Sequence, residues 1–232
     1  MKWTPYGPDA WLLQFAARLG EKAFHAGQAI LADLDRSAPP GLVEYVPGFT
    51  TLLLEFTPGS DLARDPRSLS VRFEKALRRK LPAPKRHEIP VCYDGPDLER
   101  VARTHRLSEA EVCRRHAAPV YKVYLLGFSP GFPYLGDLDP KLHTPRLAAP
   151  RQKVPAGSVA IGGPHTGIYS IESPGGWNLI GRTEVLLFDR PAGLARGGAV
   201  NPFLLRPGDT VKFVRVPVPV RTPSQPQRRG AP

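Results

Sequence analysis

Apolar and polar positions follow two different periods in the first part of the chain, which predicts a mixture of strands and helices. Short apolar or alternating runs predict strands at residues 9–16, 41–56 and 88–94. The turn dipeptide Pro47-Gly48 divides the middle run into two strands. Apolar side chains at helical spacing predict helices at residues 21–35 and 66–81. The resulting order, β-α-β-β-α-β, is typical of a ferredoxin-like (split βαβ) domain, which we expect at residues 1–95.

The pattern changes in the second part of the chain. Residues 96–118 carry two short helical stretches, the second opened by the capping-box pair Ser108 and Glu111, and predict a helical link. Beyond it, short alternating runs are separated every few residues by Pro or Gly, which predicts a β-barrel or sandwich over residues 119–216. The expected fold class is therefore α+β. The Pro- and Arg-rich residues 217–232 contain no acids and predict a disordered tail.

Composition limits the class of protein further. The 232 residues are 41% hydrophobic, enough for a core, and no apolar run approaches the roughly 20 residues of a membrane span. No signal-peptide pattern opens the sequence, so we expect a cytoplasmic protein without membrane contact. The two cysteines, Cys92 and Cys113, match neither a disulfide framework nor a metal site, and we expect both to be buried as small apolar side chains.

The formal net charge of +11 indicates an anionic partner. The excess is concentrated where glycine is also frequent, because residues 141–182 hold five basic side chains and one acidic one. A basic cleft for an anionic small molecule accounts for this concentration as well as a nucleic-acid surface does. No helix-turn-helix, zinc finger or RNA-binding signature accompanies it, so we expect no nucleic-acid partner.

Three motifs of the second domain are similar to those of one protein family. They are Phe132-Pro133-Tyr134-Leu135, the run from Pro155 to Ile161 and the run from Ser173 to Trp177. Their order and approximate spacing resemble the B-component family of bacterial ATP-dependent 5-oxoprolinase. The same domain occurs in allophanate hydrolase subunit 1, in carboxyltransferase modules and in kinase-inhibitor proteins. The resemblance implies a ferredoxin-like first domain and a cyclophilin-like β-barrel as the second.

The resemblance also implies a subunit of an enzyme and not a complete enzyme. The family's enzyme opens the lactam ring of 5-oxo-L-proline to L-glutamate with hydrolysis of ATP, together with a C-type barrel subunit and an A-type subunit. It implies ATP with Mg²⁺ as cosubstrate and no tightly bound cofactor or metal. Two alternatives stay open: a regulatory inhibitor of a sensor histidine kinase, and a carboxyltransferase-type component of urea or allophanate metabolism.

The basic, glycine-rich stretches supply the residue types that this chemistry needs. Activation of a lactam by phosphorylation requires cations beside phosphate oxygens and pre-placed donors for an oxyanion. We predict His143, Arg146 and Arg182 as catalytic residues, with His143 in proton transfer because histidine titrates near neutrality. The predicted substrate- or nucleotide-binding residues are Arg151, Lys153, Gly157, Ser158, Gly162, Gly163, Thr166, Tyr169, Ser173, Gly175, Gly176, Trp177 and Thr183.

Each of these residues also has a purely structural interpretation. The arginines can tie loops together, Lys153 can be solvated surface, and the double glycine before Trp177 can be a sharp turn beside a core side chain. The sequence contains no phosphate-binding P-loop and no nucleophile elbow, so a nucleotide site of standard type is not expected. His165 is a weaker candidate for the site. Surface or capping positions are predicted for His25, His87, His105 and His116.

Overall fold

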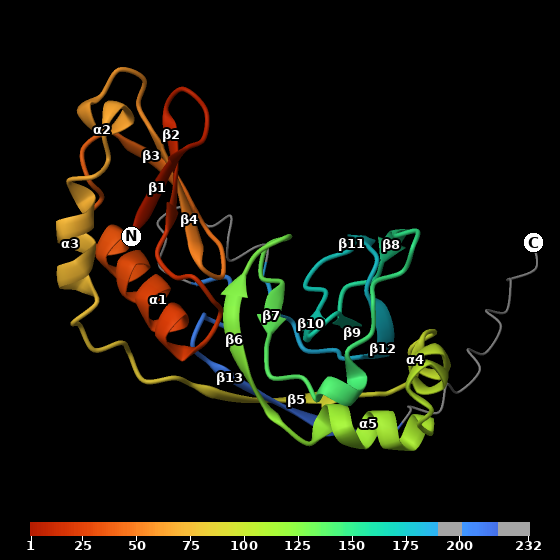
Figure 1. Ribbon diagram of the computed structural model, residues 1–232. Helices are drawn as coiled ribbons and strands as arrows, with labels where there is room; N and C mark the ends of the chain where they lie inside the picture. The colour runs from red at the N-terminus through yellow and green to blue at the C-terminus, as the bar shows by residue number, and fades with distance from the viewer. Residues whose placement is uncertain (190–200, 218–232) are drawn as a thin grey trace, which may run out of the picture.

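The computed structural model describes residues 1–189 and 201–217. The N-terminal part forms a four-stranded antiparallel sheet with the strand order β1-β2-β4-β3. Its strands are β1 (Lys2–Pro5), β2 (Ala10–Gln14), β3 (Leu42–Pro47) and β4 (Thr51–Phe56). The accompanying helices are α1 (Glu21–Arg36), α2 (Asp61–Arg64) and α3 (Leu69–Ala76). Figure 1 shows α1 and α3 on one side of the sheet, and we call this unit the N-terminal lobe.

The amphipathic pattern of α1 explains how the lobe is held together. Buried side chains such as Ile30 and Leu34 lie four residues apart, on one face of the helix. They pack with Leu13 and Leu54 of the sheet and with Phe73 of α3 in one apolar core. The helix predicted at residues 21–35 is therefore confirmed, and α3 lies inside the helix predicted at residues 66–81.

The ferredoxin-like prediction is wrong about one strand. The strand predicted at residues 88–94 exists as β5 (Arg86–Val91), but it does not join the N-terminal sheet. It pairs in parallel with β13 (Thr210–Arg215), and β1, which the sequence did not predict, takes the edge position of the lobe. Ile89 and Val91 of β5 contribute to the apolar core of the second sheet. A domain boundary at residue 95 therefore cuts through that second sheet.

The second sheet has seven strands in the order β12-β9-β10-β7-β6-β13-β5 and curls into a half-barrel. Its remaining strands are β6 (Val120–Leu126), β7 (Pro133–Leu135), β9 (Ser158–Gly162), β10 (His165–Ile168) and β12 (Asn178–Arg182). The two edges approach one another just beyond β5, where Cys92 and Arg182 exchange backbone hydrogen bonds of 2.9 and 2.8 Å. This bridge closes the curl at one end.

The closure depends on a glycine, which leads to a stability prediction. A Cβ atom on Gly181 would lie 2.5 Å from the carbonyl oxygen of Cys92, closer than packed atoms tolerate. We expect Gly181→Ala to lower the free energy of unfolding by about 1–3 kcal/mol, because the two backbones must move apart. Gly176→Ala is the matched control, since an added Cβ there meets nothing closer than 3.6 Å. Chemical denaturation measures both variants, and equal stabilities would contradict the prediction.

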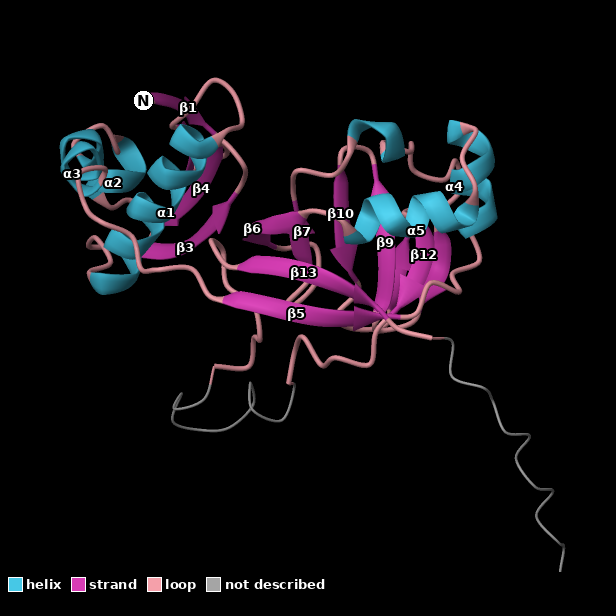
Figure 2. Ribbon diagram, turned by 90° about the horizontal axis from the view of Figure 1, so that it is seen from below, coloured by secondary structure: helices cyan, strands magenta, loops and turns pink. Residues whose placement is uncertain are grey.

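Two short helices cover the half-barrel at the end away from the N-terminal lobe, as Figure 2 shows. They are α4 (Leu98–His105) and α5 (Glu109–Ala117). The predicted cap of α5 is confirmed, because the Ser108 hydroxyl accepts a hydrogen bond from the Glu111 amide at 3.2 Å. The short 3₁₀ helix η1 (Pro140–Leu142) and the two-stranded ribbon β8 (Arg151–Val154) with β11 (Ser173–Gly175) complete the described elements.

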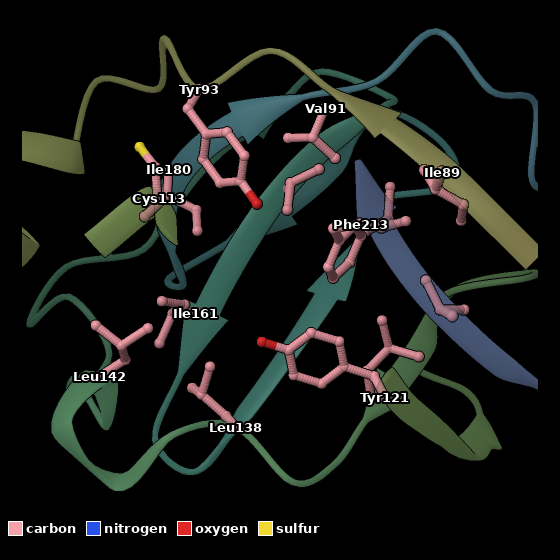
Figure 3. Packing of buried hydrophobic residues seen from close by; sticks show 14 of the residues in the cluster. Ile89, Val91, Tyr93, Cys113, Tyr121, Leu138, Leu142, Ile161, Ile180 and Phe213 are labelled. Carbon is pink, nitrogen blue, oxygen red and sulfur yellow. The ribbon is translucent and has the colours of Figure 1, made fainter. Parts of the chain in front are cut away.

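The barrel core contains a polar network that the sequence did not indicate. His116 was predicted at the surface, but its side chain is fully buried. Its Nδ1 lies 2.7 Å from the Tyr93 hydroxyl and its Nε2 2.7 Å from the Thr166 hydroxyl. Because Thr166 donates its own proton to the carbonyl of Ala160, Nε2 must donate to Thr166 and Nδ1 must accept from Tyr93. Figure 3 shows the hydroxyl groups of Tyr93 and Tyr121 pointing into the apolar cluster.

Several compositional expectations can be compared with the described residues. Cys92 and Cys113 are both free and buried, as predicted. Within residues 1–189 and 201–217, no helix is long and apolar enough to cross a membrane. The disordered tail predicted from residue 217 onward lies, apart from Pro217 itself, outside the described residues.

Candidate functional site

Trp177 lies at the centre of the predicted residues that the structure brings together. Its indole packs flat against Gly162, and a Cβ atom at that position would overlap the ring. The guanidinium of Arg146 lies 5.8 Å from the centre of the same indole. The Gly163 amide donates to the carbonyl of Thr144 at 2.8 Å and so holds the loop that carries Arg146 beside the β9–β10 turn.

Three histidine side chains lie near the loop that carries Arg146. His143 follows η1, and its Nε2 lies 3.1 Å from the carbonyl of Leu138. Burial lowers the pKa of His165, and the positive charges of His143 and Arg146 lower it further. The structure therefore brings His143 and Arg146 within electrostatic reach of His165. His105 completes the group by bonding the Thr144 hydroxyl at 2.9 Å.

A second set of predicted residues adjoins Trp177 through Tyr169. Burial raises the pKa of Tyr169, while a hydrogen bond to the backbone of Trp177 and the charges of Arg146 and Arg151 oppose the rise. Both arginines therefore lie close to this phenol. Only glycine fits at position 175, because a Cβ atom there would overlap the Tyr169 hydroxyl. We call the group formed by His143, Arg146, His165, Tyr169 and Trp177 the indole face; Arg146 is exposed, the two histidines are half-buried, and Tyr169 and Trp177 are buried beneath them.

Arg151 reaches the indole face but is already paired. Its Nη2 lies 2.8 Å from Oδ1 of the buried Asp97, whose other oxygen accepts the Leu179 amide at 2.7 Å. This ion pair links β8 to α4 and β12. The Nη1 of Arg151 and the hydroxyl of Ser173 are buried and have no hydrogen-bond partner among the described residues. Gly176 accepts a hydrogen bond from the Leu147 amide at 2.7 Å and shapes the loop.

The other predicted residues lie elsewhere. Lys153 is exposed and pairs with Glu172 at 3.2 Å. Arg182 pairs with Asp94 at 2.9 Å, at the closure of the barrel. Arg182 is the last residue of β12, about 13 Å along the strand from its first residue, Asn178. Asn178 is the residue of this strand that bonds the loop of Arg146, through the carbonyl of Pro145. Thus the structure does not gather the four predicted cations around one hollow.

The remaining small residues have structural partners. Gly157 has a φ of 81° and donates to Tyr169 at 2.7 Å, and a Cβ there would overlap the carbonyl of Thr183. The Ser158 hydroxyl donates to the Pro155 carbonyl at 2.8 Å. Thr166 belongs to the buried His116 network. These four residues, Gly157, Ser158, Thr166 and Thr183, hold the barrel and do not line the indole face.

Arg146 differs from the other predicted cations. Within the described part of the chain, no carboxylate lies within ion-pair distance of it, whereas Arg151, Lys153 and Arg182 each have one. An exposed guanidinium fixed against an indole is suited to bind a carboxylate or phosphate with two parallel hydrogen bonds. The indole face can therefore hold a small anion beside a histidine.

Sequence reasoning missed two aromatic neighbours of this face, Phe49 and Tyr134, and rated His165 as the weaker candidate. These three rings form a chain of contacts that ends at Trp177. Tyr134 belongs to the motif of residues 132–135, but that motif alone did not predict that the Tyr134 side chain packs against Trp177 and His165. Asn178 was missed as well: its Nδ2 donates to the carbonyls of Pro145 and Ile161 at 3.0 and 3.1 Å.

Comparison with known proteins gives consistent similarities. Residues 1–193 match the family model of the carboxyltransferase domain, subdomain C and D. The chain is 38% identical over 224 residues to the B component of 5-oxoprolinase from Bacillus subtilis, covering 90% of each chain. It is 47% identical over 178 residues to the B component of 5-oxoprolinase from Escherichia coli O157:H7, covering 75% of this chain and 78% of that one. The crystal structure of the protein TTHA0988 superposes with a TM-score of 0.74 at 41% identity. That match covers 90% of this chain but 40% of TTHA0988, so this chain spans less than half of that protein.

Proposed function

Because the chain belongs to the family of the carboxyltransferase domain, subdomain C and D, we propose that it works as the B component of an ATP-dependent 5-oxoprolinase. Relatives that carry this name and match most of the chain support this activity. The structural observation that carries it is the unpaired Arg146, held against Trp177 beside two histidines. The reaction opens 5-oxo-L-proline to L-glutamate and uses ATP with Mg²⁺ as cosubstrate. Its other components are a C-type barrel subunit and an A-type subunit.

The substrate of this reaction suits the indole face chemically. 5-Oxo-L-proline carries a carboxylate next to its lactam nitrogen, and Arg146 offers the cation that binds such a group. The lactam itself is a poor electrophile, so ATP activates its carbonyl oxygen before water adds. The chain's own residues then orient the lactam and stabilise negative oxygen. His143 is the candidate for proton transfer at this face, as the sequence predicted.

Arg182 and Lys153 take a different place in this proposal. The carboxylates of Asp94 and Glu172 already neutralise them in the free chain. We assign Arg182 to the closure of the barrel and Lys153 to the surface. Arg151 is paired with Asp97, but we keep it as a binding residue of the indole face. Its charge and that of Arg146 both act on the pKa of Tyr169, so the two guanidinium groups lie close to the same phenol.

The direct test is reconstitution with the partner subunits. We expect the complex of this chain with its C-type and A-type partners to release glutamate from 5-oxoproline in proportion to ATP hydrolysed. Omitting this chain, the nucleotide or either partner should abolish glutamate release. A folded, stable complex that hydrolyses no 5-oxoproline would exclude this substrate, and glutamate release without this chain would exclude the chain's part in it.

A further inference from the structure

Phe49 connects the N-terminal lobe to the indole face. It lies in the β3–β4 turn, which the Gly48 amide closes by donating to the carbonyl of Thr51 at 2.8 Å. Its ring contacts one aromatic ring on each of three barrel strands. The centroid distances are 6.3 Å to Tyr124 of β6, 5.8 Å to Tyr134 of β7 and 5.2 Å to His165 of β10. The lobe therefore reaches the candidate site through one side chain.

The contact with His165 differs in kind from the other two. Phe49 meets Tyr124 and Tyr134 edge to face, but it stacks on the imidazole with an angle of 11° between the rings. Tyr134 meets the same imidazole at an edge, with centroids 6.4 Å apart. The stack on Phe49 thus sets the plane of the His165 side chain, and Tyr134 packs against its edge.

His165 has hydrogen-bonding capacity that the described residues do not use. Its Nδ1 is buried and has no partner within residues 1–189 and 201–217. Burial lowers the pKa of this imidazole, a backbone hydrogen bond to Leu135 opposes the shift, and the other facing charges are His143, Arg146 and Asp137. The ring is therefore neutral at physiological pH and carries both a donor and an acceptor. An unsatisfied buried polar atom costs free energy, and a functional role is one reason for retaining it.

We propose that His165 is a substrate-contacting residue of the indole face and that Phe49 is the positioning residue that holds it, so that the N-terminal lobe forms part of the site. This inference rests on the proposed function. The unused Nδ1 of the neutral imidazole accepts a hydrogen bond from the lactam N–H, which lies beside the carboxylate that Arg146 takes. Because Nδ1 is covered in this structure, the imidazole turns within the plane set by the Phe49 stack when the substrate binds.

The test compares Phe49→Ala with Phe24→Ala, a matched loss of one aromatic ring between lobe and barrel. Phe24 lies edge to face with Tyr124 at 5.8 Å and beneath the Lys122 ammonium at 4.0 Å. Nuclear magnetic resonance titration of His165 in the full-length chain is the first readout. We expect Phe49→Ala to raise the pKa of His165 toward its ordinary value, Phe49→Tyr to restore it, and Phe24→Ala to leave it unchanged.

Kinetics of the reconstituted complex supply the second readout. His165→Phe keeps a flat ring against Phe49 but removes the hydrogen bond, and we expect KM for 5-oxoproline to rise about tenfold. Phe49→Ala should raise KM similarly. It should also move the acid limb of the pH profile of kcat/KM to higher pH, because the pKa of His165 rises, whereas Phe24→Ala should change neither. An unchanged His165 titration in Phe49→Ala, or equal effects of the two alanine variants, would overturn the proposal. A wild-type complex without turnover would instead refute the proposed function, and the titration would still decide whether Phe49 positions His165.

Discussion

Replacing Arg146 with alanine is expected to lower kcat/KM for glutamate release by about 100-fold, because losing the charge-assisted hydrogen bonds to the substrate carboxylate costs about 2–3 kcal/mol. The physical reason is the position of the guanidinium. Contact with Trp177 fixes it, and no carboxylate among the described residues competes for it. Its charge is therefore available to the substrate without a rearrangement that would cost free energy. The measurement is the ATP-dependent rate of the reconstituted complex over a range of 5-oxoproline concentrations.

Three further variants make this result interpretable. Arg146→Lys keeps the charge but loses the two-pronged geometry, so its rate should fall between those of wild type and alanine. Lys153→Ala removes an exposed cation of the same charge that pairs with Glu172, and its rate should stay within about twofold of wild type. Arg182→Ala should affect stability more than turnover, because its partner Asp94 lies at the barrel closure. Normal turnover by a folded Arg146→Ala complex would remove the indole face from the mechanism.

The sequence predicted those elements whose signals are local. The face of α1 and the cap of α5 depend on residues within a few positions of one another, and both are as expected. The partner of β5 depends on a strand more than 120 residues later, and alternating side chains such as Ile89 and Val91 suit either sheet equally well. Local patterns therefore identified β5 as a strand but assigned it to the wrong sheet.

The candidate site shows the same division. Arg146 and Arg182 look equivalent in the sequence, since each follows a turn-forming residue in a basic, glycine-rich stretch. What separates them is Asp94, 88 residues before Arg182 in the chain, which forms an ion pair with one and not the other. Phe49 was beyond reach for a similar reason. It lies in a turn of the N-terminal lobe, and only the packing of that lobe on the barrel brings it to His165.

Acid is expected to destabilise the protein through His116, for which the sequence predicted a surface or capping position. Burial lowers its pKa from 6.5 to about 3, since the neutral ring is enclosed with Tyr93 and Thr166. The unfolded chain binds a proton near pH 6.5 and the folded chain does not until about pH 3. The contribution of His116 to stability is therefore fully present above pH 6.5 and falls between these limits by up to about 1.4 kcal/mol per pH unit, on the order of 5 kcal/mol in all.

A variant that cannot titrate isolates this contribution. His116→Gln should be less stable than wild type at pH 7, because an amide cannot reproduce both hydrogen bonds, yet it should lose less stability between pH 6.5 and 4.5. That window lies above the range in which Glu111 and Asp65, whose pKa values are lowered to about 2, become protonated. Burial also lowers the pKa values of His105 and His165, but both remain in the variant and cancel in the comparison. Denaturant unfolding at closely spaced pH values gives the two slopes. If the free energy of unfolding of the two proteins falls with the same slope, the pKa of His116 is the same in the folded and the unfolded chain. That result would contradict the enclosure of a neutral imidazole between Tyr93 and Thr166.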